Sequence, residues 1–323
     1  MAFPSIDEPT LRACVSPADA IAAVRAAFRA DGEGHTEVPA VINLPIPGTN
    51  GEFHVKTAWV KDVPVVAIKV ASGFYDNPAR GLPTGSGLMA LFDAQTGMPV
   101  AMLFDNGFLT DIRTGAAGAV AADYLARKDV TTVGVIGSGV QARHQVRCLK
   151  EVRPFRRLLA WSPDGVGLES YCAEMRAALG ITATVAASAA EVCREADVLI
   201  TATPSREPIV RAEWLRPGLH ITALGSDTPG KQELEATCLQ RADLVVVDRL
   251  SQCARFGELS HALRLGLMAE TDVWAQLGEI VAGRKPGRTT DDQITICDLT
   301  GVGFQDTAIA ALAWERVQVK GLA

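Results

Sequence analysis

A glycine-rich turn near the middle of the chain has the residue types and spacing that bind a dinucleotide. The stretch 137–142 reads GSGVQA, a GxGxxA pattern, and follows the apolar run VGVI at 133–136. The first glycine of such a turn bends the backbone, the second lets it approach a pyrophosphate, and the small last residue lets a helix pack closely. Phosphates then meet free N–H groups at the helix N-terminus. A plain strand–helix turn is the alternative, but we predict cofactor contacts from Gly137, Ser138, Gly139, Val140 and Gln141.

Residues suited to the two ribose groups follow two later strands. Asp164, just after Ser162, stands where an acidic residue would bind the 2′-hydroxyl of the adenosine ribose. No arginine stands there to hold a 2′-phosphate, which favours NAD over NADP. An ordinary Ser-Pro-Asp turn is the alternative for Asp164. Thr201 and Thr203 end another strand, where the nicotinamide ribose usually lies, and are predicted cofactor contacts as well.

A lysine and an arginine in apolar surroundings are suited to acid–base and carboxylate chemistry. Lys69 lies on a predicted strand among apolar residues, so burial would lower its pKa and suit it to proton transfer. A lysine that reaches the surface is the alternative. Arg113 comes just before the alanine-rich part of a predicted helix, and its planar guanidinium can pair with a carboxylate through two hydrogen bonds.

The first third of the chain, which would position Lys69, has the pattern of helices with an antiparallel sheet. One helix is expected over 7–32, and a Gly/Pro-rich loop over 73–87. The apolar and β-branched runs predict strands over 54–60, 63–70, 88–92 and 100–106. A second helix is expected over 109–127.

The rest of the chain alternates apolar strands with helices, which is typical of a doubly wound parallel sheet. The strands are expected over 132–136, 157–161, 198–203, 220–224, 244–248 and 294–299. We predict an α/β fold: a Rossmann doubly wound parallel sheet plus an α+β substrate-binding and dimerisation domain with an antiparallel sheet. That second domain comprises 1–120 with 305–323, including an amphipathic helix over 307–319, and the NAD-binding domain comprises 121–304.

Composition and charge exclude several classes of protein. A length of 323 residues suits two domains. A net charge of −6 argues against nucleic acid as a partner. Neither an 18-residue apolar run nor a signal peptide is visible, so no membrane span is expected. The seven scattered cysteines indicate free thiols in a reducing cytoplasm, and no metal-ligand cluster is suggested.

The whole chain resembles the ornithine cyclodeaminase/μ-crystallin family. Besides the GxGxxA turn with Gln141, the matched blocks are Ile68-Lys69-Val70, Gly81-Leu82-Pro83-Thr84, Leu109-Thr110-Asp111-Ile112-Arg113-Thr114 and Leu224-Gly225-Ser226-Asp227-Thr228-Pro229-Gly230-Lys231-Gln232-Glu233-Leu234. The GxGxxA turn and the last block, in that order, are fairly specific together.

The resemblance implies the reaction and the assembly. Family members act at a carbon that carries both nitrogen and carboxylate, so we expect NADH-dependent reduction of a small 2-imino acid to an L-amino acid. The stretch SGFYDNP at 72–78 is similar to one branch of the family, and from this resemblance iminosuccinate, reduced to L-aspartate, is the substrate that we expect first. The resemblance also implies that Asp227 faces the substrate nitrogen, with Lys231 in support, and that two subunits pair through the substrate domain. A helix N-cap near Gly230 is the alternative for Asp227.

The chemistry of a 2-imino acid assigns roles to the remaining residues. Arg113 would hold the carboxylate with help from Thr84, and Lys69 would supply the proton. Many family members carry a further arginine in the early Pro-rich segment, but 38–42, VPAVI, has none. Lys56 or Arg80 could replace it and hold the second carboxylate of a dicarboxylic substrate. An outward-facing strand residue is the alternative for Lys56.

Two other function classes fit parts of the pattern. A cyclodeaminase-type lyase would bind NAD tightly and regenerate it in each turnover. A non-catalytic binding protein would lack the residue types at Lys69 and Asp227, and this chain has both.

Overall fold

The chain divides into two compact units, and the computed structural model describes residues 4–322. Unit 1 contains the residues up to Arg113 together with those from Val302 onward, and unit 2 is Thr114–Gly301. The helix α3 (Phe108–Leu125) contains the first boundary. The boundary predicted at residue 120 lies in the same helix.

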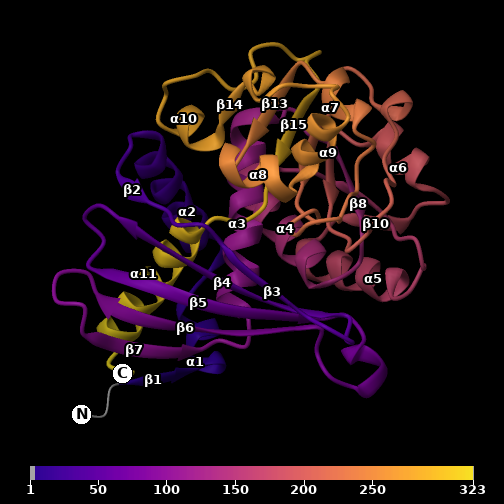
Figure 1. Cartoon of the computed structure of the whole chain (residues 1–323). Helices are drawn as coiled ribbons and strands as arrows, with labels where there is room; N and C mark the ends of the chain where they lie inside the picture. The colour runs from indigo at the N-terminus through magenta and orange to yellow at the C-terminus, as the bar shows by residue number, and fades with distance from the viewer. Residues whose placement is uncertain (1–3, 323) are drawn as a thin grey trace. The chain divides into compact units, whose positions relative to one another are not determined.

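Unit 1 is built on the predicted antiparallel sheet (Figure 1). Neighbouring strands β4 to β7 run antiparallel, β2 and β3 both pair with β4, and β1 adds a parallel edge beside β7. The strands are β1 (Ser5–Asp7), β2 (Thr36–Glu37), β3 (Ile42–Ile46), β4 (Gly51–Val60), β5 (Val65–Phe74), β6 (Gly85–Asp93) and β7 (Pro99–Phe104). The loop predicted over 73–87 is shorter, because β5 and β6 stay paired as far as Gly73 and Gly85.

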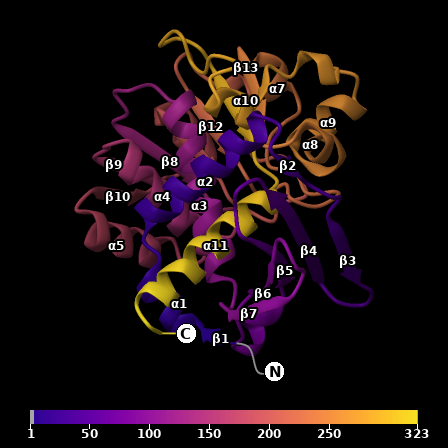
Figure 2. The same ribbon diagram turned by 90° about the vertical axis from the view of Figure 1, so that its left-hand side faces the viewer.

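Three helices of unit 1 are α1 (Glu8–Cys14), α2 (Pro17–Gly32) and α11 (Gly303–Val319). The prediction of one helix over 7–32 is wrong. Ser16 precedes a proline, which disfavours helical backbone, and it begins α2 through a capping box with Asp19. Helix α11 packs against α2 and against strands β4 and β5, and Figure 2 shows it near the first helices of the chain.

Unit 2 has an eight-stranded parallel sheet in the order β10-β9-β8-β11-β12-β15-β13-β14, which confirms the predicted fold class. The strands are β8 (Thr132–Ile136), β9 (Arg157–Trp161), β10 (Thr182–Val185), β11 (Val198–Thr201), β12 (His220–Ala223), β13 (Leu244–Val247), β14 (Ala275–Gln276) and β15 (Thr295–Asp298). The sequence missed β10 and β14, because both are short edge strands without a long apolar run. The chain reverses its direction of travel through the sheet at β8, where such sheets bind ligands.

Along the chain, most helices of unit 2 connect these strands. Besides the remainder of α3, they are α4 (Val140–Val152), α5 (Leu168–Leu179), α6 (Ala189–Glu195), α7 (Thr237–Arg241), α8 (Leu250–Phe256), α9 (Glu258–Arg264) and α10 (Leu277–Val281). Short 3-10 turns cover Asn77–Arg80 in unit 1, and Ala212–Trp214 and Glu270–Asp272 in unit 2.

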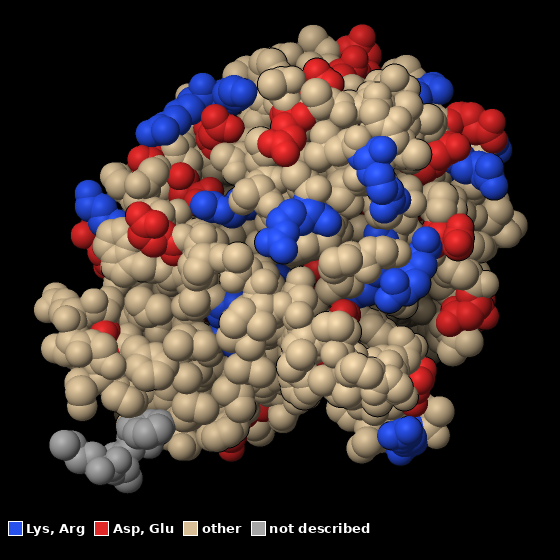
Figure 3. Space-filling view, viewed as in Figure 1, with Lys and Arg blue, Asp and Glu red and all other residues tan. Residues whose placement is uncertain are grey.

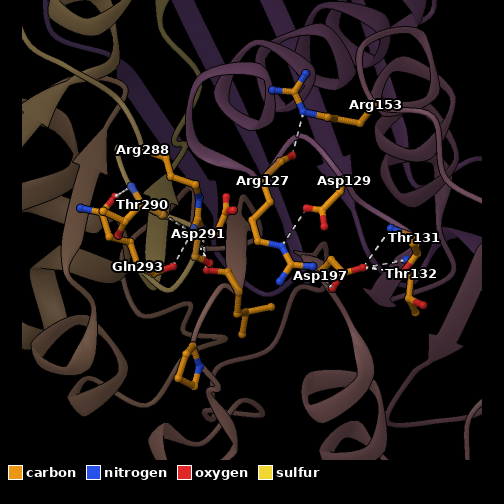
Figure 4. Close-up of polar contacts among 12 residues, drawn as sticks. Arg127, Asp129, Thr131, Thr132, Arg153, Asp197, Arg288, Thr290, Asp291 and Gln293 are labelled. Atoms are coloured by element: carbon orange, nitrogen blue, oxygen red, sulfur yellow. Dashed lines mark hydrogen bonds and ion pairs between the residues drawn. The ribbon is translucent and has the colours of Figure 1, made fainter.

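A polar network ties together the amino ends of the parallel strands (Figure 4). Asp197, just before β11, accepts hydrogen bonds from the backbone N–H groups of Thr131 and Thr132 at 2.9 and 3.0 Å. Burial opposes its charge, but these bonds and Arg216 hold the pKa of Asp197 below its ordinary value. Arg288 donates to the carbonyl oxygens of Leu125 and Gln293. Because ligands of such sheets bind at the opposite, carboxyl edge, this network stabilises the fold.

Three other findings bear on function. No helix within residues 4–322 is long and apolar enough to cross a membrane. In the same part of the chain no group of three or more metal-ligating side chains is found. All seven cysteines are buried and carry free thiols.

Candidate active site

The predicted dinucleotide turn lies at the carboxyl end of β8. Gly137 has a φ of 115°, and a Cβ added there would lie 2.6 Å from the carbonyl oxygen of Ala202, so only glycine fits. A Cβ added at Gly139 would have nothing within 4 Å, so this side of the turn is open. Gly139 precedes α4, whose first turn receives no side-chain cap. The open glycine and the uncapped N–H groups fit a pyrophosphate.

The loop after β9 is connected to this turn. The hydroxyl of Ser138 donates to the carbonyl of Val166 at 2.9 Å. Asp164 Oδ1 accepts from the Ser162 hydroxyl at 2.9 Å and from the Val166 N–H at 3.1 Å. Asp164 thus stabilises the Ser-Pro-Asp turn, which was the alternative role for this residue. The carboxylate is exposed, and its Oδ2 makes no hydrogen bond to the described residues, so ribose binding stays a prediction.

An arginine that the sequence reading missed also holds the dinucleotide turn. Arg143, in the first turn of α4, donates to the carbonyl of Gly139 at 3.1 Å. Its Nε binds Glu174 of α5 at 2.7 Å. Arg143 therefore engages the carbonyl groups of the turn. Its position one residue after the GxGxxA pattern was the available signal.

Thr201 and Thr203, predicted as cofactor contacts, are buried at the carboxyl end of β11. Their hydroxyls both donate to the carboxylate of Glu233, each at 2.7 Å. A contact of either threonine with the cofactor stays a prediction. Glu233 lies within one of the blocks that resemble the family, but its sequence context alone indicates no role for it.

In unit 1, Lys69 and Arg113 lie on either side of one carboxylate. Lys69 Nζ is 3.0 Å from Asp306 Oδ2, and Arg113 Nε is 2.9 Å from Asp306 Oδ1. Arg113 also donates to the side-chain oxygen of Gln305 at 3.0 Å. Lys69, Arg113 and Asp306 are 2%, 4% and 0% exposed, so this group of charges is almost fully removed from water.

Burial shifts the acid–base properties of this cluster. It lowers the pKa of Lys69 to about 7, because desolvation outweighs the attraction of Asp306. Burial alone would raise the pKa of Asp306, but the charges of Arg113, Lys69 and Lys56 hold it below its ordinary value. The cluster therefore keeps a carboxylate ionised beside a lysine that exchanges its proton near neutral pH. The predicted burial of Lys69 is confirmed.

The packing of α11 on the sheet explains how Asp306 reaches Lys69. A Cβ added at Gly303 would lie 2.1 Å from the carbonyl oxygen of Thr57, so the helix begins directly against β4. One turn later the Thr307 hydroxyl donates to the Ala58 carbonyl at 2.7 Å and accepts from the Ala67 N–H at 3.3 Å. These contacts place Asp306 over the face of the sheet that carries Lys69.

The other proposed substrate ligands of unit 1 differ in burial. Lys56 is directly opposite Lys69 in the β4–β5 pair and is only 6% exposed, so it does not face outward. Thr84 is half-buried before β6, and its carbonyl accepts from the Phe74 N–H at 2.7 Å. Arg80 ends a 3-10 turn and is exposed.

Sequence reasoning missed Asp306 and Gln305, which complete the unit 1 cluster. The terminal helix was expected from residue 307, whereas α11 begins at Gly303 and includes both residues. The polar run Gln305-Asp306-Thr307 within an otherwise apolar segment was the available signal. Each of the three is fully buried, which is uncommon for such side chains unless they are paired.

In unit 2, Asp227 follows β12 in a loop that is not helical. The structure has no helix between Leu224 and Ala236, so the helix N-cap alternative is wrong. Lys231 Nζ is 2.8 Å from Asp227 Oδ1, and the lysine side chain is 5% exposed whereas the aspartate is 40% exposed. Lys231 therefore holds an accessible carboxylate at the carboxyl edge of the parallel sheet, as the sequence proposed.

The fold and the GxGxxA turn define unit 2 as a dinucleotide-binding Rossmann domain. Comparison with protein families then gives the family of the whole chain. Residues 11–321 match the ornithine cyclodeaminase/mu-crystallin family, and the chain belongs to it.

Known proteins of this group cover nearly the whole chain. An iminosuccinate reductase of Paracoccus denitrificans (strain Pd 1222) is 33% identical over 321 residues, covering 98% of each chain. The structure of a Δ(1)-pyrroline-2-carboxylate reductase of Thermococcus litoralis in complex with NADH and L-proline is 32% identical, with a TM-score of 0.95 over 99% of this chain and 98% of that one. An archaeal alanine dehydrogenase dimer with bound NAD is 36% identical, with a TM-score of 0.92 and the same coverage.

Proposed function

We propose that this protein is an NAD-dependent oxidoreductase that reduces a small 2-imino acid to an L-amino acid. The observation that carries the proposal is the buried cluster of Lys69, Asp306 and Arg113, which offers both a carboxylate ligand and a proton donor. The GxGxxA turn fits the pyrophosphate of the cofactor. The relatives named above act on imino acids or amino acids, and two of the solved structures hold NADH or NAD.

Each of the proposed site residues has a distinct part in this reaction. NADH held at the GxGxxA turn would supply the hydride that reduces the imine carbon. Arg113 binds the substrate carboxylate, with Thr84 as a further hydrogen-bond donor. Lys69 delivers a proton to the nitrogen, because its lowered pKa lets it release one near neutral pH. Asp227 stabilises the positive charge of an iminium or exchanges its proton, and Lys231 orients it.

Iminosuccinate is our preferred substrate, with L-aspartate as the product. Its second carboxylate needs a second cation, and Lys56 is the better candidate because it is buried beside Lys69, whereas Arg80 is exposed. The similarity to the Paracoccus iminosuccinate reductase also supports this choice.

The test is NADH oxidation with a panel of 2-oxo acids in the presence of ammonia, which form the imino acids in solution. We expect oxaloacetate with ammonia to be the best pair and to consume NADH stoichiometrically. NADH should also exceed NADPH in kcat/KM, because Pro163 stands where a 2′-phosphate would need an arginine. Release of ammonia from ornithine without net NADH consumption would instead support the lyase. A tenfold preference for NADPH, about 1.4 kcal/mol, would overturn the cofactor assignment.

We also propose that the protein is a homodimer joined through the sheet of unit 1. One face of this sheet packs on the helices, and the other carries Val66, Ile68, Val70, Ala90 and Met102, all incompletely buried. The same face includes Ile42, Leu44, Trp59 and Phe104, which are 61%, 54%, 40% and 45% exposed. Figure 3 shows few charged side chains over the part of the drawn face where unit 1 lies. An apolar surface of this kind needs a partner, and a second copy is supported by the alanine dehydrogenase dimer.

Placing a charge at the centre of this face should dissociate the dimer. Ile68→Glu would bury an unpaired carboxylate between the two copies, so we expect light scattering to give the mass of one chain at micromolar concentration. The matched control is Val319→Glu, on the exposed end of α11 at 79% exposure, which should stay dimeric. A monomeric unmodified protein, or a dimer that persists in Ile68→Glu, would contradict this interface.

A further inference from the structure

One buried carboxylate fastens two neighbouring strands of unit 2 at their carboxyl ends. Glu233 is 0% exposed, and its side chain accepts four hydrogen bonds. Oε1 accepts from the N–H and the hydroxyl of Thr203 at 2.6 and 2.7 Å. Oε2 accepts from the hydroxyl of Thr201 at 2.7 Å and from the N–H of Gly225 at 2.8 Å. Because Thr201 ends β11 and Gly225 follows β12, Glu233 joins the ends of both strands.

Glu233 is held without a cationic partner. No lysine, arginine or histidine of residues 4–322 forms an ion pair with it. Burial raises the pKa of Glu233, although the bonds from Thr201, Thr203 and Gly225 favour the charged form. Glu258, the first residue of α9, fixes its backbone by accepting from the Glu233 and Leu234 N–H groups at 2.7 and 3.1 Å. A buried carboxylate is costly to keep, so its four bonds indicate a requirement for fixed geometry.

The strand ends that Glu233 fastens touch the dinucleotide turn. Ala202 lies between the two threonines, and its carbonyl oxygen is the atom that a Cβ at Gly137 would meet at 2.6 Å. A Cβ at Gly225 would lie 2.2 Å from the Thr203 carbonyl and 2.5 Å from the Glu233 carboxylate. Glycine at both positions therefore lets three backbone segments meet around Glu233.

The place of these segments in the sheet indicates which half of the cofactor they face. The dinucleotide crosses the sheet where its order reverses, with the adenosine half toward β9 and the other half toward β11 and β12. We propose that Glu233 is a positioning residue: it fixes the backbone at Thr203 and Gly225 and so sets the position of the nicotinamide ring for hydride transfer. This inference rests on the proposed function for its kinetic part only.

The decisive variant is Glu233→Gln, which keeps the shape of the side chain. Its amide group can satisfy Thr203 or Gly225 but not both, because one carboxylate oxygen becomes an N–H₂ donor. We expect hydrogen–deuterium exchange to rise about tenfold in peptides spanning 201–205 and 223–227. The dissociation constant for NADH, measured by its fluorescence, should change less than about threefold, because the 137–140 turn is intact. In turnover, kcat should fall about tenfold, and the isotope effect of 4-deuterated NADH on kcat should increase.

Glu235→Gln is the matched control. Glu235 lies two residues away in the same loop, and its carboxylate accepts from the Ala212 N–H at 3.0 Å, away from the strand ends. It should match the unmodified protein in every measurement. The exchange and NADH-binding measurements need no substrate, so they test Glu233 even if the protein reduces no imino acid.

A Glu233→Gln protein with unchanged local exchange and an unchanged isotope effect would overturn the proposal. If that variant does not fold, Thr201→Val, which removes a single donor to Glu233, decides the question. Faster exchange confined to 201–205 and 223–227 in Thr201→Val supports the positioning role, and its absence contradicts it.

Discussion

Replacing Lys69 with methionine is expected to lower kcat by about 100-fold or more, which corresponds to ~2.7 kcal/mol of transition-state stabilisation. Methionine keeps the length of the side chain but cannot donate a proton to the substrate nitrogen. NADH binding should persist, because the dinucleotide turn belongs to unit 2. Steady-state kinetics and NADH fluorescence titration measure the two effects separately. Asp227→Asn should likewise lower kcat while NADH binding persists, since the proposed role of Asp227 also concerns the reacting nitrogen.

The proposed role of Lys69 also predicts how the reaction rates of the unmodified protein change with pH. Reduction requires protonated Lys69, and its pKa is about 7, so the rate of reduction should fall as pH rises through this value. Oxidation of the amino acid requires Lys69 in its neutral form, which accepts the proton. The rate of oxidation should therefore rise over the same pH range. Both changes should be absent from the residual activity of Lys69→Met. Lys61→Met, at an exposed position just after β4, is the control. Near-normal kcat in both Lys69→Met and Asp227→Asn would show that the proposed active site is wrong.

Replacing Asp306 with asparagine is expected to have the second large effect. The change leaves Arg113 and Lys69 buried without a counter-charge, and breaking a buried pair in this way costs about 3–5 kcal/mol. We therefore expect a lower melting temperature and a kcat/KM reduced by at least about 100-fold at pH 7. Thermal unfolding followed by circular dichroism, together with steady-state kinetics, would measure both.

The pH profile distinguishes a role in catalysis from loss of stability alone. Asp306 raises the pKa of Lys69 against the effect of burial. Asp306→Asn should therefore move the pH at which reduction declines to a lower value. The matched control is Arg316→Gln, which removes the exposed ion pair between α11 and Asp19 of α2 and should cost at most about 1 kcal/mol. A pH profile that stays in place in Asp306→Asn would mean that this carboxylate does not act on Lys69.

Some features of the site could be read from neighbouring residues alone. The GxGxxA turn is local, because a strand, two glycines and a helix start follow each other within a few residues. The burial of Lys69 was also predictable, since Ile68 and Val70 mark a strand in an apolar environment. The family resemblance implied that Lys231 supports Asp227, and the structure has the two side chains 2.8 Å apart.

Other features depend on residues that are distant in sequence. Asp306 is 237 positions from Lys69, and no local pattern links them. Their contact exists because Gly303 and Thr307 bring α11 onto β4 and β5. The break between α1 and α2 was misjudged for another reason. The apolar spacing continues across Ser16, while the capping box that begins α2 there is a hydrogen-bond geometry.

The sequence by itself determined the fold class, the position of the dinucleotide turn and the choice of Lys69, Arg113 and Asp227 as candidate site residues. These follow from local periodicity and from short motifs, in which neighbouring residues act together. Only the tertiary structure decided that Asp306 holds Lys69 and Arg113, that Lys56 is buried beside Lys69, and that Glu233 fastens the ends of β11 and β12. The physical reason is that the burial and pairing of a charge depend on which distant segments cover it, and one residue type is compatible with many such surroundings.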